Sequence, residues 1–156
     1  MRWTILVLIV VWGGVGPGAG PAAAQENISV RLEQQYDQES NPKKRVKLAI
    51  ELTKERLNQL RGAYDTEDAG KREEAVEAYL VALHRLETAV TAAAHGGSSK
   101  SAEMHLRRQG RDLENLKTNV SYFDRPALEK VIGRVVALRE QILYSIMNPR
   151  KEATKK

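Results

Sequence analysis

The histidines and one nearby carboxylate are the residues whose types and spacing come closest to metal chemistry. His84 and Glu87 lie three residues apart, so on a helix both side chains could reach one ion. His105 follows Met104, and a His/Met pair can ligate haem iron. Adjacent helical side chains point about 100° apart, so these two could not bind the same iron. We expect surface or boundary histidines and no bound cofactor, with His84, Glu87 and His105 as weak metal candidates.

Catalytic nucleophiles and acid pairs have little support. The sequence contains no cysteine, and it has no Gly-x-Ser-x-Gly elbow that would activate a serine. Glu73 and Glu74 suit the positively polarised start of a helix, and the acidic residues within 65–68 suit a turn. We therefore expect a protein without enzymatic activity.

A run of cations at a predicted helix start is the clearest anomaly. Helices usually place acids in the first turn, because cations there oppose the helix dipole. Free backbone N–H groups beside cations can bind a phosphate, an anionic lipid headgroup or an acidic peptide. The alternatives are a helix that begins earlier and side chains that are simply solvated. The candidate anion site is Lys43, Lys44, Arg45 and Lys47, and two further basic clusters are Arg107, Arg108 and Arg111, and Arg150, Lys151, Lys155 and Lys156.

The N-terminus is typical of a targeting segment. Arg2 precedes an apolar run from residue 3 to 15, which is shorter than the roughly 20 residues that a spanning helix needs. Glycines and a proline follow, and then small residues end at Ala24 before the polar Gln25. This pattern predicts a signal peptide over residues 1–24, cleaved between Ala24 and Gln25, and export to the periplasm or the medium. An uncleaved membrane anchor is the alternative.

The charge balance of the exported chain is modestly positive. Removal of Arg2 reduces the 25 basic residues to 24 against 20 acidic ones, which leaves a net charge of +4. This excess favours weak binding to anionic surfaces. We expect no nucleic-acid partner, because the few aromatic residues mostly fall in apolar stripes and export removes the chain from the genome.

Apolar residues recur every three or four positions over most of the mature chain, which predicts amphipathic helices and no strands. Asn41 before Pro42 and Asp124 before Pro126 are typical helix starts. We expect about four main helices in two hairpins, over 41–94 and 101–148, with the third helix running from about Ser101 to Tyr122. The predicted fold is all-α, either an antiparallel helical bundle or two stacked helical hairpins. Residues 25–40 are expected to form a polar arm or short helix, and residues 150–156 a disordered charged tail.

Residues of the first hairpin recur at the spacings of a known helical repeat, at Leu57, Leu60 and Tyr64 in the first helix and at Ala75, Tyr79 and Ala82 in the second. On these residues the hairpin resembles a tetratricopeptide helix pair over about 40 residues. The turn is longer than in that repeat, Arg61 stands where the repeat prefers a small residue, and no copy follows at a spacing of 34. The resemblance implies a peptide- or protein-binding groove without chemistry. The whole chain also resembles small exported helical proteins of bacteria.

These features favour an exported helical protein that binds a protein partner or itself. Apolar residues beside the main stripes are expected to form an exposed groove or a dimer face. The alternatives are a bundle that binds a small ligand or metal, and binding to membrane surfaces or polyanions through the basic clusters. The predicted groove residues are Leu48, Leu52, Val76 and Leu80.

Overall fold

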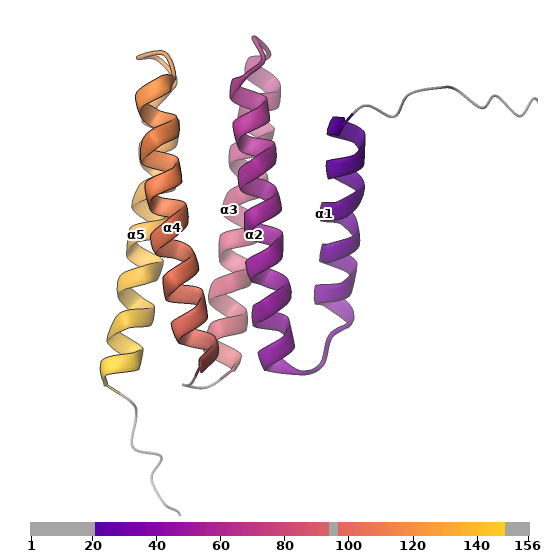
Figure 1. The fold of residues 1–156 in the computed structure, drawn as a ribbon, viewed down its shortest axis with the longest axis vertical. Coiled ribbons are helices and arrows are strands. Elements are labelled where there is room, and N and C mark those ends of the chain that lie inside the picture. The colour runs from indigo at the N-terminus through magenta and orange to yellow at the C-terminus, as the bar shows by residue number, and fades with distance from the viewer. Residues whose placement is uncertain (1–20, 94–96, 149–156) are drawn as a thin grey trace, which may run out of the picture.

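The computed structural model describes residues 21–93 and 97–148, and over these residues it contains five α-helices and no strand (Figure 1). This confirms the all-α prediction, but the predicted number of helices was one too low. The additional helix covers most of the segment expected to be a polar arm or short helix. The first 20 residues of the predicted signal peptide and the predicted tail lie outside the described residues. The helices are α1 (Pro21–Gln38), α2 (Pro42–Tyr64), α3 (Ala69–Ala92), α4 (Gly97–Asn119) and α5 (Arg125–Met147).

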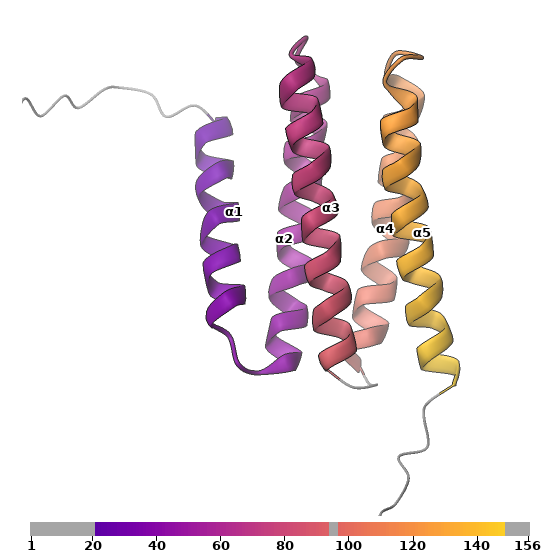
Figure 2. The same ribbon diagram turned by 180° about the vertical axis from the view of Figure 1, so that it is seen from behind.

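The helices form a row of two hairpins with α1 at one end (Figures 1 and 2). Helices that follow one another in the chain run in opposite directions, so α2 pairs with α3 and α4 pairs with α5. The hairpins meet through α2 against α4 and α3 against α5, with a further contact between α3 and α4. Helix α1 packs on α2, on the side away from the second hairpin. Among the described residues, no helix covers the corresponding outer side of α4 and α5.

Leucine and other aliphatic side chains fill the core between the helices. They recur at helical spacing on every helix from α2 to α5, so each of these helices turns one continuous apolar stripe inward. Each such side chain stabilises the fold by about 1.5–3 kcal/mol relative to leaving it exposed. The largest aliphatic side chains that are completely buried are Leu52, Leu60, Leu83, Leu86, Leu106, Leu113 and Leu128.

Side-chain caps fix the starts of two helices. The Oδ1 atom of Asn41 accepts hydrogen bonds from the backbone N–H groups of Lys43 and Lys44, at 3.0 and 3.3 Å. Asp68 accepts one from the N–H of Lys71 at 3.1 Å, and this bond lowers the pKa of the Asp68 carboxyl. The Asn41 cap confirms the helix start predicted there.

Asp124 does not cap α5 as predicted. Its backbone is already helical, with φ −87° and ψ −19°, so the side chain makes no bond to the first N–H groups of the helix. The carboxylate instead accepts hydrogen bonds from the guanidinium of Arg72, at 2.9 Å, and from the hydroxyl of Ser121, at 2.7 Å. Asp124 therefore ties the start of α5 to α3.

Two aromatic residues at the predicted end of the third helix are exposed and lie outside α4. Helix α4 begins four residues earlier than predicted and ends at Asn119, so Tyr122 and Phe123 fall in the turn before α5. Their exposed fractions are 75% and 90%, and their rings meet edge to face with centroids 6.0 Å apart. Tyr144 is also exposed, at 71%.

The docking of α1 corrects the predicted apolar groove. Leu52 is completely buried and lies on the face of α2 that Arg45 and Arg56 share, which is the face that contacts α1. Val76 is 6% exposed and belongs to the core. Leu48 and Leu80 are half-buried against the same core. Helix α1 and the core therefore cover the apolar surface that was predicted to form an exposed groove.

Polar contacts around one tyrosine hold α1 in place. Tyr36 is 3% exposed, and its ring lies between the guanidinium groups of Arg45 and Arg85, at 4.6 and 5.4 Å from the ring centroid. Its hydroxyl donates to the backbone carbonyl of Arg85 at 2.9 Å. One turn earlier, Glu33 pairs with Arg56 at 2.6 Å. Tyr36 thus joins α1 to both helices of the first hairpin.

Replacing Tyr36 with leucine should loosen α1 selectively. Tyr36→Leu keeps an apolar side chain but removes the cation–π contacts and the hydrogen bond, which together should lower the local free energy of α1 opening by about 1–3 kcal/mol. Amide hydrogen exchange should accelerate in α1 and stay unchanged in α5. The exposed Gln35→Ala is the matched control. Unchanged exchange in α1 would contradict this description of its docking.

Candidate functional site

His105 is a half-buried hydrogen-bonding group at the contact between α4 and α2. Its Nε2 atom lies 2.9 Å from the Oγ1 atom of Thr53, whose hydroxyl donates to the carbonyl of Ile50. Because that hydroxyl has a single hydrogen, the histidine must donate from Nε2. Burial, followed by the nearby cations of Arg108 and Lys54, lowers the pKa of His105 to about 4. His105 is therefore neutral at pH 7, and its Nε2 is already engaged.

The other two metal candidates lie on α3 and do not join His105. His84 is exposed, and its Nδ1 atom is 3.4 Å from Glu87 Oε2. The same carboxylate oxygen binds the guanidinium of Arg134 on α5. Within residues 21–93 and 97–148, no three His, Asp or Glu side chains are grouped closely enough to hold a metal ion. The spacing of His84 and Glu87 thus produces a local contact between the two side chains, and Glu87 links it to α5.

The predicted anion cluster at the start of α2 is divided by the fold. Lys43, Lys44 and Lys47 are exposed, whereas Arg45 is half-buried against the Tyr36 ring. Two of the free N–H groups at the helix start are occupied by the Asn41 side chain. The fold thus separates Arg45 from the three exposed lysines.

The outer side of the second hairpin has a groove with a volume of 410 Å³ between α4 and α5. On α4, His105, Gln109 and Asp112 face the first hairpin, and residues on the opposite side of the helix line the groove. The floor is apolar, and its most accessible residue, Val136, is 42% exposed. The lining comprises Leu106, Gly110, Ile132, Val135 and Val136, with Arg107, Arg111, Glu114, Asn115 and Arg139 among them.

Arginine–carboxylate ion pairs lie at the edges of the contacts between helices. Each pair joins residues far apart in the sequence, at N–O distances of up to 3.7 Å. The side chains are at least partly buried, apart from Asp37, which is exposed. In a partly buried site such a pair is stronger than on an open surface. The six pairs are Arg56–Glu33, Arg85–Asp37, Arg61–Asp112, Arg72–Asp124, Arg134–Glu87 and Arg139–Glu103.

Two arginines of the groove differ from these six. Arg107 and Arg111 are exposed, and in the part of the chain that the structure describes no carboxylate lies within ion-pair distance of either. Arg139 binds Glu103 at 2.8 Å, and Glu114 binds Lys117 at 2.8 Å, so the other charges of the groove are compensated. The groove therefore has an apolar floor beside two uncompensated positive charges.

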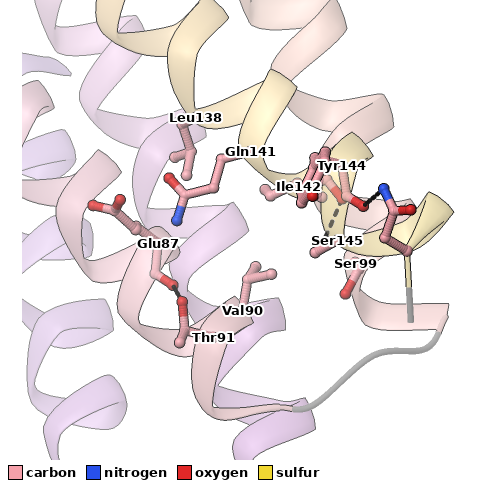
Figure 3. A pocket seen from close by; sticks show the side chains of 10 residues that line it. Glu87, Val90, Thr91, Ser99, Leu138, Gln141, Ile142, Tyr144 and Ser145 are labelled. Carbon is pink, nitrogen blue, oxygen red and sulfur yellow. Dashed lines mark hydrogen bonds between the residues drawn. The ribbon is translucent and has the colours of Figure 1, made fainter. Parts of the chain in front are cut away.

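A second cavity of 570 Å³ lies between α3, α5 and the start of α4 (Figure 3). Figure 3 shows Glu87 and Thr91 of α3 on one side and Gln141 and Ser145 of α5 on the other. Several polar groups are engaged within the protein: Thr91 donates to the Glu87 carbonyl, and Ser145 donates to the Ile142 carbonyl. Ser99, which is 2% exposed, completes the polar lining.

A buried polar pair in the core was not predicted from the sequence. Tyr79 is completely buried, and its hydroxyl donates to Gln109 Oε1 at 2.8 Å. Burial raises the pKa of Tyr79, so the phenol remains protonated and can donate. Gln109 is 2% exposed, and its Nε2 group has no hydrogen-bond partner. Gln109 lies three residues after Leu106 and four before Leu113, so its spacing placed it on the inward face of α4, and only its polar amide argued against burial.

The sequence matches no protein-family model, no curated protein and no solved structure. None of the helices in the described ranges has both the length and the apolar composition required to cross a membrane.

Acid should destabilise the fold through His105. In the unfolded chain the residue protonates below its ordinary pKa of 6.5, whereas in the folded protein it does so only near 4. Between these two pH values, protons therefore bind the unfolded chain more tightly and favour unfolding. The free energy of unfolding should fall by about 3 kcal/mol as the pH falls from 7 to 4. Chemical denaturation across this range is the measurement.

His105→Gln can keep the bond to Thr53 without titrating, so it should show a smaller loss of stability between pH 7 and 4 than the wild type. His84→Gln, at an exposed position of α3, is the matched replacement of a histidine outside this contact. Equal pH dependence of stability in the wild type and in His105→Gln would contradict the assignment of the acid destabilisation to His105.

Proposed function

We propose that this chain is a non-enzymatic interaction protein and that the outer groove of α4 and α5 is its binding surface. The observation that supports this most strongly is the asymmetry of the row. The outer side of the first hairpin is covered by α1, whereas none of the described helices covers the equivalent side of the second, which has an apolar floor. Grooves of this kind between helices commonly receive a partner helix.

The composition of the sequence supports the same proposal. The segment before Gln25 fits a cleaved signal peptide, so we place the protein in the periplasm or the medium. The residues that resemble a tetratricopeptide helix pair pack in or against the core, and Tyr79 and Ala82 among them are buried. Such residues maintain the hairpin and leave binding to its outer surfaces.

A small ligand in the 570 Å³ cavity is a second candidate function. Its volume lies within the range of small-molecule sites, and its lining combines apolar and polar side chains. The cavity would suit a neutral polar molecule better than an anion, because Glu87 is part of its wall. Native mass spectrometry of the protein purified from its own source would show such a ligand as a fixed added mass.

Site-specific cross-linking tests the proposed surface. A photoreactive amino acid at Val136 should form one dominant adduct in the extracytoplasmic fraction, because the side chain would contact the bound partner. The matched control is Val81, which is 52% exposed on α3. Unlabelled wild-type protein should compete for the adduct, and Val136→Lys should not.

Mass analysis would distinguish a dimer of this chain from another polypeptide. No adduct from Val136, or equal adducts from Val136 and Val81, would refute the groove as the binding surface.

A further inference from the structure

We propose that the groove between α4 and α5 receives an acidic amphipathic helix whose two carboxylates, four residues apart, bind Arg107 and Arg111. This inference rests on the proposed function, because it specifies the partner of the same surface. It follows from the charges of the groove and from the way this protein already docks a helix.

The contact between α1 and the first hairpin shows an acidic helix docked against two arginines, which there lie on two helices, whereas Arg107 and Arg111 both lie on α4. Glu33 and Asp37 lie four residues apart on α1. They pair with Arg56 at 2.6 Å and with Arg85 at 3.7 Å, on the two helices of the hairpin. Between them the Tyr36 side chain enters the contact. An acidic helix is therefore the kind of element that covers the outer side of a hairpin here.

The open groove has the complementary half of such a contact. Arg107 and Arg111 are four residues apart, so they lie on one face of α4, about one helical turn from each other. The lining on α4 extends from residue 106 to 115, or roughly 13 Å, which is enough for about two turns of a partner helix. Carboxylates at the same spacing on the partner would meet both guanidinium groups.

Electrostatics favours an acidic partner over a second copy of the chain. A partner that covers the floor near Val136 must also remove water from Arg107 and Arg111, which costs free energy unless opposite charges replace it. Two copies meeting through this groove by a twofold axis would instead bring like charges together. The concave apolar floor also fits a helix better than a flat lipid surface.

Peptide binding provides a direct test. The probe is a dye-labelled synthetic helix of about four turns, with leucines on one face and two glutamates four residues apart beside them. A matched peptide has glutamines at those two positions. Fluorescence anisotropy should show binding of the glutamate peptide to the full chain and roughly tenfold weaker binding of the glutamine peptide.

Charge reversal identifies the site. Arg107→Glu with Arg111→Glu should weaken binding of the glutamate peptide by about tenfold or more, and a lysine peptide of the same design should then bind to that variant. Lys43→Glu with Lys44→Glu makes the same change in net charge at the exposed start of α2 and should leave binding nearly unchanged. Circular dichroism would verify that both variants are folded.

Several outcomes would overturn the inference. Equal binding of the glutamate and glutamine peptides would remove the role of the carboxylates, and equal loss in the two double variants would indicate general charge attraction. The inference also fails if the protein binds neither peptide but sediments with phosphatidylglycerol vesicles through Arg107 and Arg111. It fails equally if the protein binds neither peptide and forms a dimer that requires these two arginines. If the Val136 adduct persists unchanged in the Arg107→Glu, Arg111→Glu variant, the proposed function stands and the acidic partner does not.

Discussion

The contact between the two hairpins is the interaction on which the rest of the structure depends. The chain has no cysteine, so no disulfide can join its helices, and stability has to come from packing. Aliphatic side chains supply most of that packing, but they fit one another in several registers. The Tyr79–Gln109 and Thr53–His105 hydrogen bonds, at 2.8 and 2.9 Å, cross from the first hairpin to the second. Since a buried polar group without its partner is costly, these bonds favour one register.

The same contact determines where the molecule can bind something. Hairpins that stack side by side form a row, and a row has two ends. Helix α1 closes one end with a largely polar contact around Tyr36. The other end keeps an apolar floor and two arginines that have no carboxylate partner among the described residues. The candidate binding surface is thus a consequence of how the row ends, and no motif within any single helix encodes it.

The sequence predicted what depends on local spacing. The helical period of apolar residues gave the all-α fold, and the Asn41–Pro42 pair gave the start of α2, because both effects act within one or two turns. The weak pattern of residues 25–40 concealed α1, since its docking depends on Tyr36 and Glu33 meeting arginines that lie far along the chain. For the same reason Leu52 was expected to be exposed: a stripe shows that a residue is apolar but not which neighbour covers it.

The candidate site was predicted only in fragments. Arg107 and Arg111 were recognised as basic, and their cluster was one of three. These two arginines stand apart because the other interface arginines form ion pairs. For the arginines on α2 and α3, the partners lie 23 to 52 residues away in the sequence. Asp124 shows the opposite case, because a sequence typical of a cap forms a tertiary ion pair instead. Long-range pairing of this kind cannot be read from the residues alone.

Nuclear magnetic resonance of the protein titrated with the glutamate peptide would test the central claim most directly. We predict that the side-chain Nε–Hε signals of Arg107 and Arg111 and the methyl signals of Val136 shift together and saturate at one peptide per chain. The corresponding signals of Arg45 and Arg85, which hold α1, should stay in place. Shifts confined to α1 and α2, to the cavity between α3 and α5, or to no defined site would contradict the assignment of the α4–α5 groove as the binding surface.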